Sequence, residues 1–551
     1  MLKKIRIDEI LLTILFLYTT FLSFVAGNLY YLSPKGPDFN YYKRYYDYFF
    51  GLVPTTNIEQ GLLYYYLNSF LVSLRSEVVN KNNYIEFVSQ AIQTTNLIFY
   101  LLGLLGVAVL LKMKNYQNRI ILIVLILLNF FPQLYNARLF FKPEIVIFPM
   151  LVWTIVFIEA YLKKRKLMYL MFTVPPLAII FTSKANLALM VFLYFSFTYL
   201  NKVYKFNRKN LTTVLLVFLI VFSILSFENY KENQLLIFEH VSPEEFTGKA
   251  DLGYLVNLDI NLLLDDPFRH SQKDSFIGVV LLDTFNDYFT ISWNDDSSVY
   301  LYDSKNILNT KFKPYLSIMF TSIFYSLLIY FIFRNSKYKN IFIMPFFGIF
   351  VQMGLSQFTQ YNPENGDVAK PYYYSFFLAI SFAFLIAELL KKHFNVSIVG
   401  LFLFIILMVH ILGFPKYENI EREKFISFNN EISPTCSLNN HLFKELDSDC
   451  VDYSDLNCDT LYDSLNKVII VNSEFINKNY LNNDSVVNLI KNKETKEVKS
   501  YEECKILEND GWLLSKKFVV EKTPIFNLLT FVLYVFSSIF FSYKLLFRKT
   551  F

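Results

Sequence analysis

The sequence has few charged residues and little glycine for its length. Of 551 residues only 18% are charged and 15 are Gly, whereas 54% are hydrophobic, with 60 Phe and 40 Tyr. A soluble domain carries about a quarter charged residues. This shortage excludes a soluble enzyme, a disordered chain and a fibre, and leaves a protein that crosses a membrane several times. The net charge of +5 is small for this length, so we expect no nucleic-acid partner.

Several chemical signatures are also missing. The chain has only five His, too few to suggest a His-based metal site. It contains no phosphate-binding Walker loop, no GxGxxG fingerprint and no nucleophile elbow. Nucleotide-driven and serine-hydrolase chemistry are therefore not indicated.

The apolar stretches predict about twelve transmembrane helices, because about 20 apolar residues span a bilayer as a helix. The expected fold is an all-α polytopic membrane protein, with interfacial helices in the first outer loop and a small extracytoplasmic α/β domain. The predicted spans are 9–27, 92–111, 120–137, 144–162, 167–182, 185–200, 211–227, 315–333, 340–357, 372–390, 396–414 and 524–543.

The stretch 167–200 is short for two crossings. Pro175 and Pro176 argue against one straight helix, and Lys184 falls where the tip of a helical hairpin would be. A charge at mid-bilayer costs roughly 2.5–3.5 kcal/mol, which a tip position avoids. We therefore predict two short arms with Lys184 between them.

Lys and Arg gather in every second connection, which predicts cytoplasmic termini and an active face on the extracytoplasmic side. The high content of Lys, Asn, Ile and Phe suggests an AT-rich bacterial genome, and hence an inner (plasma) membrane. The predicted organisation is a transmembrane module at 1–414 with outer loops 28–91 and 228–314, an extracytoplasmic domain at 415–523, and a last span and tail at 524–551.

The cysteines agree with this orientation. All four lie in the 415–523 domain, and an even number of Cys in an oxidising compartment indicates disulfides. A zinc site is the alternative, although no pair has CxxC spacing, and three pairings are open. The candidates are Cys436, Cys450, Cys458 and Cys504.

Two carboxylates fall inside predicted spans. Glu159 and Glu388 lie one turn from a basic cytoplasmic end, so we expect them to reach Lys163 and Lys392 at the interface.

The first outer loop holds the most informative motif. Pro34, Gly36 and Pro37 end the first span, and Asp38 follows at once. Farther on, an amphipathic segment at 59–75 is too polar at its ends to span, so we expect it in the membrane interface.

This layout resembles the GT-C superfamily of integral-membrane glycosyltransferases of the PMT/ArnT-like type, in which an Asp heads the first outer loop before two interfacial helices. NARLFFKPEIVIF at the fourth span is similar to the superfamily's Arg–Pro–Glu/Asp stretch. FTSKANLAL is similar to its Thr–Lys–Gly hairpin tip, with Ala185 in place of Gly, and AKPYYYSFFLAI is similar to its Arg–Tyr–x–x–Pro entry, with Lys370 and Pro371 instead. The likeness in layout covers most of 1–400.

The resemblance implies transfer of a sugar from a polyprenyl phosphate to a glycan, lipid or protein at the outer face. Such a reaction expels a phosphate, which positive charge stabilises. We expect the cations at the outer ends of spans to bind it: Arg138, Lys142, Lys184 and Lys370.

The acceptor hydroxyl needs a base within hydrogen-bonding reach, for which the resemblance implies Asp38. In-line attack would invert the anomeric carbon. A second carboxylate or an acceptor contact is the open role for Asp47, Glu59, Asp283 and Asp287. Several have an alternative role: Asp38 could cap a helix, Glu59 could be a charge in the first turn of a helix, and Asp283 and Asp287 could form a solvated face or hold a divalent cation. No metal ligand is assigned.

Two other functions compete. A lipid-linked glycan flippase or other transporter would line a central cavity with charge, which the sequence does not suggest. An O-antigen polymerase or ligase also has about twelve spans and a large outer loop, but an Arg-rich one, whereas the large loops here carry few Arg.

Overall fold

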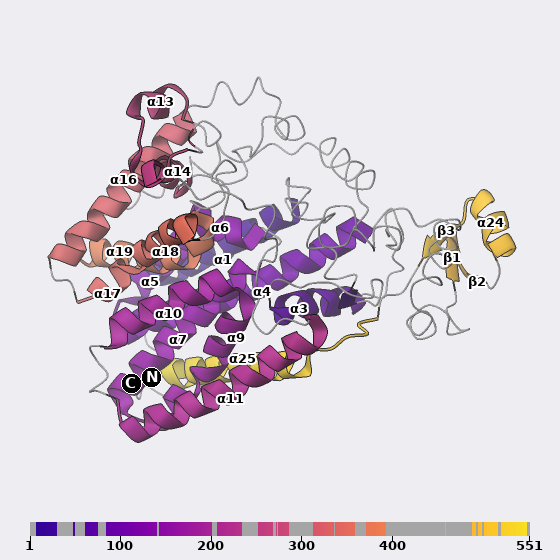
Figure 1. Cartoon of the computed structure of the whole chain (residues 1–551), viewed down its shortest axis with the longest axis horizontal. Helices are drawn as coiled ribbons and strands as arrows, with labels where there is room; N and C mark the ends of the chain where they lie inside the picture. The colour runs from indigo at the N-terminus through magenta and orange to yellow at the C-terminus, as the bar shows by residue number, and fades with distance from the viewer. Residues whose placement is uncertain are drawn as a thin grey trace.

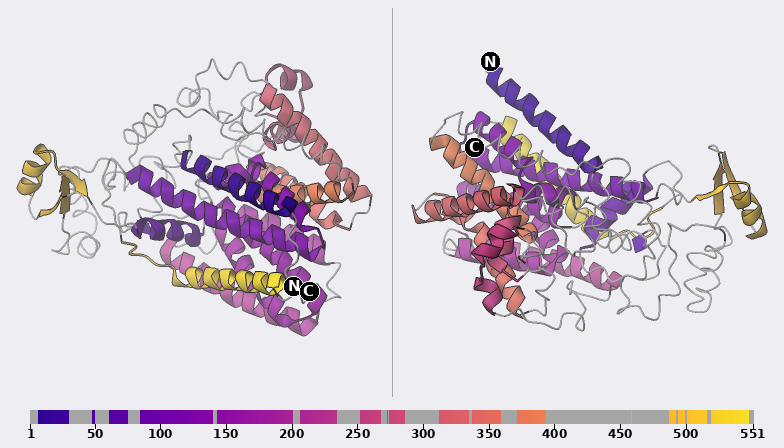
Figure 2. Two further views of the ribbon diagram at one scale, coloured as in Figure 1. Left: turned by 180° about the vertical axis from the view of Figure 1, so that it is seen from behind. Right: turned by 90° about the horizontal axis from the view of Figure 1, so that it is seen from above.

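The computed structural model shows a bundle of helices, with a small sheet at one side of it (Figures 1 and 2). The structure describes residues 7–29, 48–49, 61–74, 84–139, 143–200, 206–233, 252–267, 272, 274–285, 312–334, 337–358, 371–392, 458, 487–491, 494–498, 501–515 and 519–547.

The bundle is helical throughout its described part. Seven of its helices or helix pairs are long and apolar enough to cross a membrane, and four shorter apolar helices accompany them. The elements are α1 (Ile7–Leu29), α3 (Leu62–Ser73), α4 (Tyr84–Met113), α5 (Asn118–Leu128), α6 (Pro132–Leu139), α7 (Glu144–Lys164), α8 (Leu167–Met171), α9 (Val174–Ser183), α10 (Ala185–Leu200), α11 (Arg208–Asn233), α12 (Leu252–Val256), α13 (Ile260–Asp265), α14 (Phe276–Asp283), α16 (Phe312–Phe333), α17 (Lys339–Phe342), α18 (Met344–Phe358), η6 (Pro371–Tyr374), α19 (Ser375–Lys392) and α25 (Ile525–Phe547).

Eleven of the predicted spans fall on these elements, and the prediction at 396–414 lies outside the described residues. The single span predicted at 120–137 is wrong in one respect, because α5 ends at Leu128 and α6 begins at Pro132. Proline cannot donate the backbone hydrogen bond that would continue α5, and it suits the first position of a new helix.

The hairpin predicted at 167–200 is confirmed. Pro175 and Pro176 stand in the first turn of α9, where missing N–H groups cost little. Lys184 separates α9 from α10 with an extended backbone. The charged residue therefore sits at the tip of the hairpin, as the cost of burying it predicted.

Two glycines let α4 and α7 approach closely at the centre of the bundle. A Cβ at Gly103 would lie 2.2 Å from the Phe148 ring, and one at Gly106 would lie 2.7 Å from Val152 Cγ1. Small residues permit such close packing between membrane helices. Next to them, the Trp153 indole N–H donates to the Leu102 carbonyl at 3.0 Å.

Burial distinguishes central from peripheral helices. In the apolar windows of α7 and of η6–α19, 89% and 94% of residues are buried, against 17% for α11 and 39% for α25. Apolar side chains exposed along α11 and α25 suit contact with lipid rather than with water.

The bundle has two distinct ends. Helix α1 begins and helix α25 ends at the same one, which we term the terminal end (Figures 1 and 2). There Glu159 of α7 forms a 2.6 Å ion pair with Lys114, just after α4. Glu388 of α19 accepts a 2.5 Å hydrogen bond from the Tyr116 hydroxyl. The sequence did not predict either partner, since both come from the connection after α4.

The opposite end, which we term the site end, holds the start of α7 and the tip between α9 and α10. Helix α3 packs against α4 and α25 near this end. Its existence within the predicted 59–75 segment is confirmed, but Tyr64, Tyr65 and Asn68 are all buried in the protein. Much of α3 is thus covered by protein.

The C-terminal unit contains the described strands. Strands β1 (Val487–Lys491), β2 (Glu494–Val498) and β3 (Leu513–Ser515) form an antiparallel sheet in the order β2-β1-β3. Lys491 pairs with Glu494, and Ile490 pairs with Leu513 on the other side of β1. The α/β character expected for this domain depends on two β-rich runs, WLLSKKFVVEK at 512–522 and NKVIIVNSEF at 466–475. The first is confirmed in part by β3, and the second lies outside the described residues.

Helix α24 (Tyr501–Asn509) precedes β3 and ends in a tight turn. Gly511 has φ +82°, a conformation that only glycine adopts readily, and Trp512 N–H donates back to Leu507 O at 2.9 Å.

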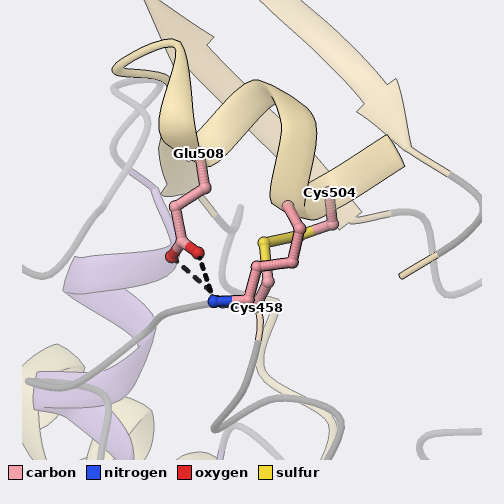
Figure 3. Close-up of a disulfide and its surroundings, with 4 residues drawn as sticks. Cys458, Cys504 and Glu508 are labelled. Atoms are coloured by element: carbon pink, nitrogen blue, oxygen red, sulfur yellow. Dashed lines mark hydrogen bonds and ion pairs between the residues drawn. A yellow bond between two sulfur atoms is a disulfide. The ribbon is translucent and has the colours of Figure 1, made fainter. Parts of the chain in front are cut away.

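A disulfide joins Cys458 to Cys504 of α24 across 46 residues, which confirms one predicted bridge (Figure 3). The Glu508 carboxylate also accepts from Cys458 N–H at 3.1 Å. The sequence positions of Cys436 and Cys450 fall in the part of the chain that the structure does not describe.

Candidate active site

The site end is organised around one ion pair. Glu144 is the first residue of α7 and is fully buried, and its Oε1 lies 2.6 Å from Lys184 Nζ at the hairpin tip. A buried carboxylate is costly unless a cation or hydrogen bonds compensate it. The presence of this ion pair at the start of a membrane-spanning helix makes the site end a candidate functional site.

Two tyrosines of η6 complete the ion pair from a third segment. The Tyr372 hydroxyl donates to Glu144 Oε2 at 3.4 Å, and Lys184 Nζ stands 5.0 Å from the centre of the Tyr373 ring. Both tyrosines are buried. The ring supplies a cation–π contact, so α7, the α9–α10 tip and η6 jointly fix the ammonium group.

Lys184 remains open to a ligand. Its side chain is 18% exposed while that of Glu144 is 0% exposed. An ammonium group has three donors. One is directed at Glu144, so the group can also bind an anion from the exposed side. A phosphate is the anion that such a lysine commonly binds.

A backbone contact supports the tip from behind. Gly61, just before α3, donates its N–H to the Ser183 carbonyl at 2.8 Å. A Cβ at Gly61 would lie 2.8 Å from the Thr182 carbonyl oxygen, so a larger residue would push the tip away. The residue preceding Lys184 is thereby tied to the first loop.

The predicted phosphate ligand Arg138 lies on α6 and is fully buried. Its guanidinium carbon is 5.8 Å from the Tyr100 ring centre, and its carbonyl accepts from Asn96 Nδ2 at 2.7 Å. Asn96 in turn accepts from the Tyr64 hydroxyl at 2.8 Å. Because α6 packs against η6, Arg138 belongs to an element that borders the ion pair.

Asp283 ends α14 and is 1% exposed. Its carbonyl accepts a hydrogen bond from Gln133 of α6, and its side chain lies near Tyr374 of η6. Tyr374 packs directly on Gly348 of α18. The predicted solvated face is therefore wrong for Asp283, whose apolar helix FIGVVLLD is mostly buried.

The remaining predicted site residues lie in parts of the chain that the structure does not describe. The structure thus brings Lys184, the α6 element of Arg138 and the α14 element of Asp283 around η6. The residues outside the described part are Asp38, Asp47, Glu59, Lys142, Asp287 and Lys370.

Sequence reasoning missed three residues of the site. Glu144 stood inside the quoted KPEIVIF motif, and an acidic residue opening a span of otherwise apolar character was the available signal. Tyr372 and Tyr373 resembled ordinary interfacial aromatic residues. Nothing in the sequence indicated that they would meet Glu144 and Lys184.

In the described ranges, no group of three or more His, Cys, Asp or Glu side chains could hold a metal ion. The carboxylates and tyrosines described there are the groups available for acid–base chemistry, and Lys184 offers positive charge to an anion on its exposed side.

Comparison with known proteins gives one match. Residues 83–227, about a quarter of the chain, match the family described as dolichyl-phosphate-mannose-protein mannosyltransferase. The matched segment runs from α4 to α11 and contains Arg138, Glu144 and Lys184. The resemblance drawn from the motifs is confirmed. No curated protein and no solved structure matches the chain.

Proposed function

We propose that this chain is a membrane glycosyltransferase like those of the dolichyl-phosphate-mannose-protein mannosyltransferase family, which its residues 83–227 match, and that it transfers mannose, or a closely related sugar, from a polyprenyl phosphate to a glycan, lipid or protein acceptor. The acceptor approaches at the site end, which in this proposal faces the extracytoplasmic side of a bacterial inner membrane.

One observation carries the proposal: the ion pair of Glu144 and Lys184, held by Tyr372 and Tyr373 at the site end. The exposed side of Lys184 binds the donor phosphate. Glu144 keeps the ammonium group in place and balances its charge while the site is empty, which limits the cost of a charge at the edge of the membrane. The apolar surface of neighbouring spans receives the polyprenyl chain.

The transfer step forms one bond and breaks another. The acceptor oxygen attacks C1 of the sugar, and the bond from C1 to the phosphate oxygen breaks, so the configuration at C1 inverts. Asp38 takes the proton from the acceptor hydroxyl. The leaving polyprenyl phosphate keeps the electron pair and gains negative charge, which Lys184 stabilises more strongly than it stabilises the bound donor.

The other predicted residues have supporting parts in the proposal. Lys142 and Lys370 flank Glu144 and η6 in the sequence and supply further positive charge to the phosphate. Arg138, which is buried on α6 beside η6, adds positive charge behind the proposed phosphate site. Asp47, Glu59, Asp283 and Asp287 are the carboxylates that an acceptor or a divalent cation would contact, and addition of EDTA distinguishes those two uses.

The test uses purified protein in lipid nanodiscs with radiolabelled polyprenyl-phosphate mannose, glucose and arabinose, and a membrane extract as acceptor. We expect label to move from at least one donor with wild type and to drop by about 10²–10⁴-fold with Asp38→Asn, the range for loss of a general base. Transfer that is unchanged in Asp38→Asn would remove Asp38 from the mechanism. Absence of transfer from every donor would contradict the proposed function.

A further inference from the structure

A short extended segment, 519–524, connects the C-terminal sheet with α25. We term it the strap; Figure 1 draws it as the yellow segment that runs beside α3 into α25. The backbone N–H groups of Glu521 and Lys522 both donate to the carbonyl of Phe49, at 3.0 and 3.4 Å. The strap therefore docks on a part of the first loop that is more than 400 residues away in the sequence.

A side-chain contact reinforces this docking. Lys522 Nζ stands 3.6 Å from the centre of the Tyr48 ring. Tyr48 and Phe49 are 2% and 1% exposed, so the ring that receives the cation belongs to the protein interior. A cation over a tyrosine face contributes most where water is partly excluded.

The strap is fixed at its other end as well. The Glu228 carboxylate of α11 accepts from the backbone N–H of Phe526 at 3.2 Å and from that of Asn527 at 3.0 Å. It also accepts from Asn527 Nδ2 at 2.7 Å. The first N–H groups of a helix have no partner within it, and a carboxylate there also suits the helix dipole. The start of α25 is thus held in one position.

From the strap, packed groups lead to the candidate active site. Phe49 meets Tyr66 of α3 with ring centres 6.2 Å apart, and the hydroxyl of Tyr66 also interacts with Thr523 of the strap. Helix α3 begins after Gly61, whose N–H binds the Ser183 carbonyl directly before Lys184. In the sequence, Tyr48 and Phe49 follow shortly after Asp38.

We propose that the strap is a positioning element for sugar transfer: Lys522 and the backbone of Glu521 hold Tyr48 and Phe49, and thereby fix this part of the first loop against α3 at the site end. The inference rests on the proposed function. Since Glu144, Tyr372 and Tyr373 contact the Lys184 side chain directly and the strap reaches it only through the backbone before the tip, we expect the strap to affect the transfer step more than binding of the donor.

The first test is kinetic and compares three variants. We expect Lys522→Met to lower kcat about three- to tenfold, as loss of a partly desolvated cation–π contact implies. The donor KM should stay within about twofold of wild type, because the anion site is untouched. Lys522→Arg keeps a cation over the ring and should restore kcat. Lys231→Met, an exposed position on α11 near Glu228, is the matched control.

The kinetic result can overturn the proposal in two ways. A kcat for Lys522→Met equal to that of Lys231→Met would show that the contact does not serve transfer. Equal losses in Lys522→Met and Lys522→Arg, with a donor KM that rises in parallel, would show a general structural defect instead of positioning.

The second test measures docking of the strap on the first loop by cross-linking and does not depend on enzyme activity. Phe49→Cys with Glu521→Cys places two thiols on backbone segments that are joined by a hydrogen bond, and a short bismaleimide cross-linker that reacts with both thiols spans the remaining gap. We expect an intramolecular 49–521 cross-link by peptide mass spectrometry in full-length protein in nanodiscs, and none in a Phe49→Cys, Lys231→Cys control. A folded pair without the cross-link overturns the proposal, and if the pair misfolds, the kinetic comparison decides alone. A cross-link in a protein whose wild type transfers no sugar would leave docking intact and reject the proposed function.

Discussion

The two ends of the bundle each hold a lysine–glutamate pair with the same separation of 2.6 Å, yet their surroundings differ. At the terminal end, Lys114 and Glu159 are 16% and 25% exposed. At the site end, Glu144 is 0% exposed and also receives the Tyr372 hydroxyl. Solvent reaches both groups of the first pair, whereas the fully buried Glu144 carboxylate depends on its protein partners. The two ion pairs therefore have the same N···O separation but differ in the burial of the carboxylate, and we expect the buried pair to matter more for stability and activity.

The largest difference in kcat between the two ends is expected when the lysine of each pair is replaced. Lys184→Met removes the cation proposed to face the leaving phosphate, so we expect kcat to fall about 10²–10³-fold, the cost of losing one preorganised donor. Lys114→Met should change kcat less than about twofold, because Lys114 lies at the terminal end and takes no part in the proposed site. Transfer assays on both variants under identical conditions make the comparison. Similar losses at the two ends would mean that the pair at the site end has no special role.

The two glutamates test the same contrast through stability. Glu144→Gln keeps the side-chain volume but leaves Lys184 without its counter-charge, and we expect a loss of about 2–3 kcal/mol in unfolding free energy, less than a fully buried pair because Lys184 is partly exposed. Glu159→Gln should cost about 0–1 kcal/mol. Thermal unfolding in detergent, followed by intrinsic fluorescence, measures both. Equal shifts in Tm would contradict the difference.

The hydrogen bond at the terminal end should affect stability alone. Tyr116→Phe removes the donor to Glu388, which is 8% exposed. We expect a cost of about 1–2 kcal/mol, as for other buried groups that lose a partner. Donor KM and kcat should equal those of wild type, since no part of the site end changes. A fall in kcat without a fall in Tm would show that this end also serves the reaction.

The smallest expected effect is that of Tyr372→Phe. Its hydrogen bond to Glu144 is 3.4 Å long, near the upper limit for such a bond, so its removal should cost less than about 1 kcal/mol. The corresponding decrease in kcat/KM is at most about fivefold. A decrease above about 100-fold would show that the tyrosine does more than orient Glu144, and would direct attention to its hydroxyl as a reactant contact.

The sequence predicts well those features that one local rule determines. The tip at Lys184 follows from two prolines and from the cost of a charge within the bilayer, and the structure has it there. The disulfide prediction followed from an even number of cysteines in one segment. The location of the helices follows from the length of apolar runs, and the break before Pro132 was missed because the apolar run continues through it.

Contacts between residues that are far apart in the sequence could not be predicted from local rules of this kind. Glu144 meets Lys184 across 40 residues and Tyr372 across 228 residues, and no spacing rule reaches that far. Phe49 and the strap are a second case, because backbone hydrogen bonds between remote segments leave no signature in residue type. The roles of Asp38, Lys142 and Lys370 remain predictions that rest on the family resemblance.

The carboxylate of Glu228 also bears on how the protein is synthesised. It receives the first N–H groups of α25 from residues 298 and 299 positions later in the chain. A ribosome thus completes α11 long before the helix that it caps has been made. Helix α25 can reach its capped position, and the strap can dock on Phe49, only after residues 519–527 have been made. A nascent chain that ends before residue 519 would already contain Glu144 and Lys184, while it would lack the backbone and side-chain contacts that the strap makes with Tyr48 and Phe49.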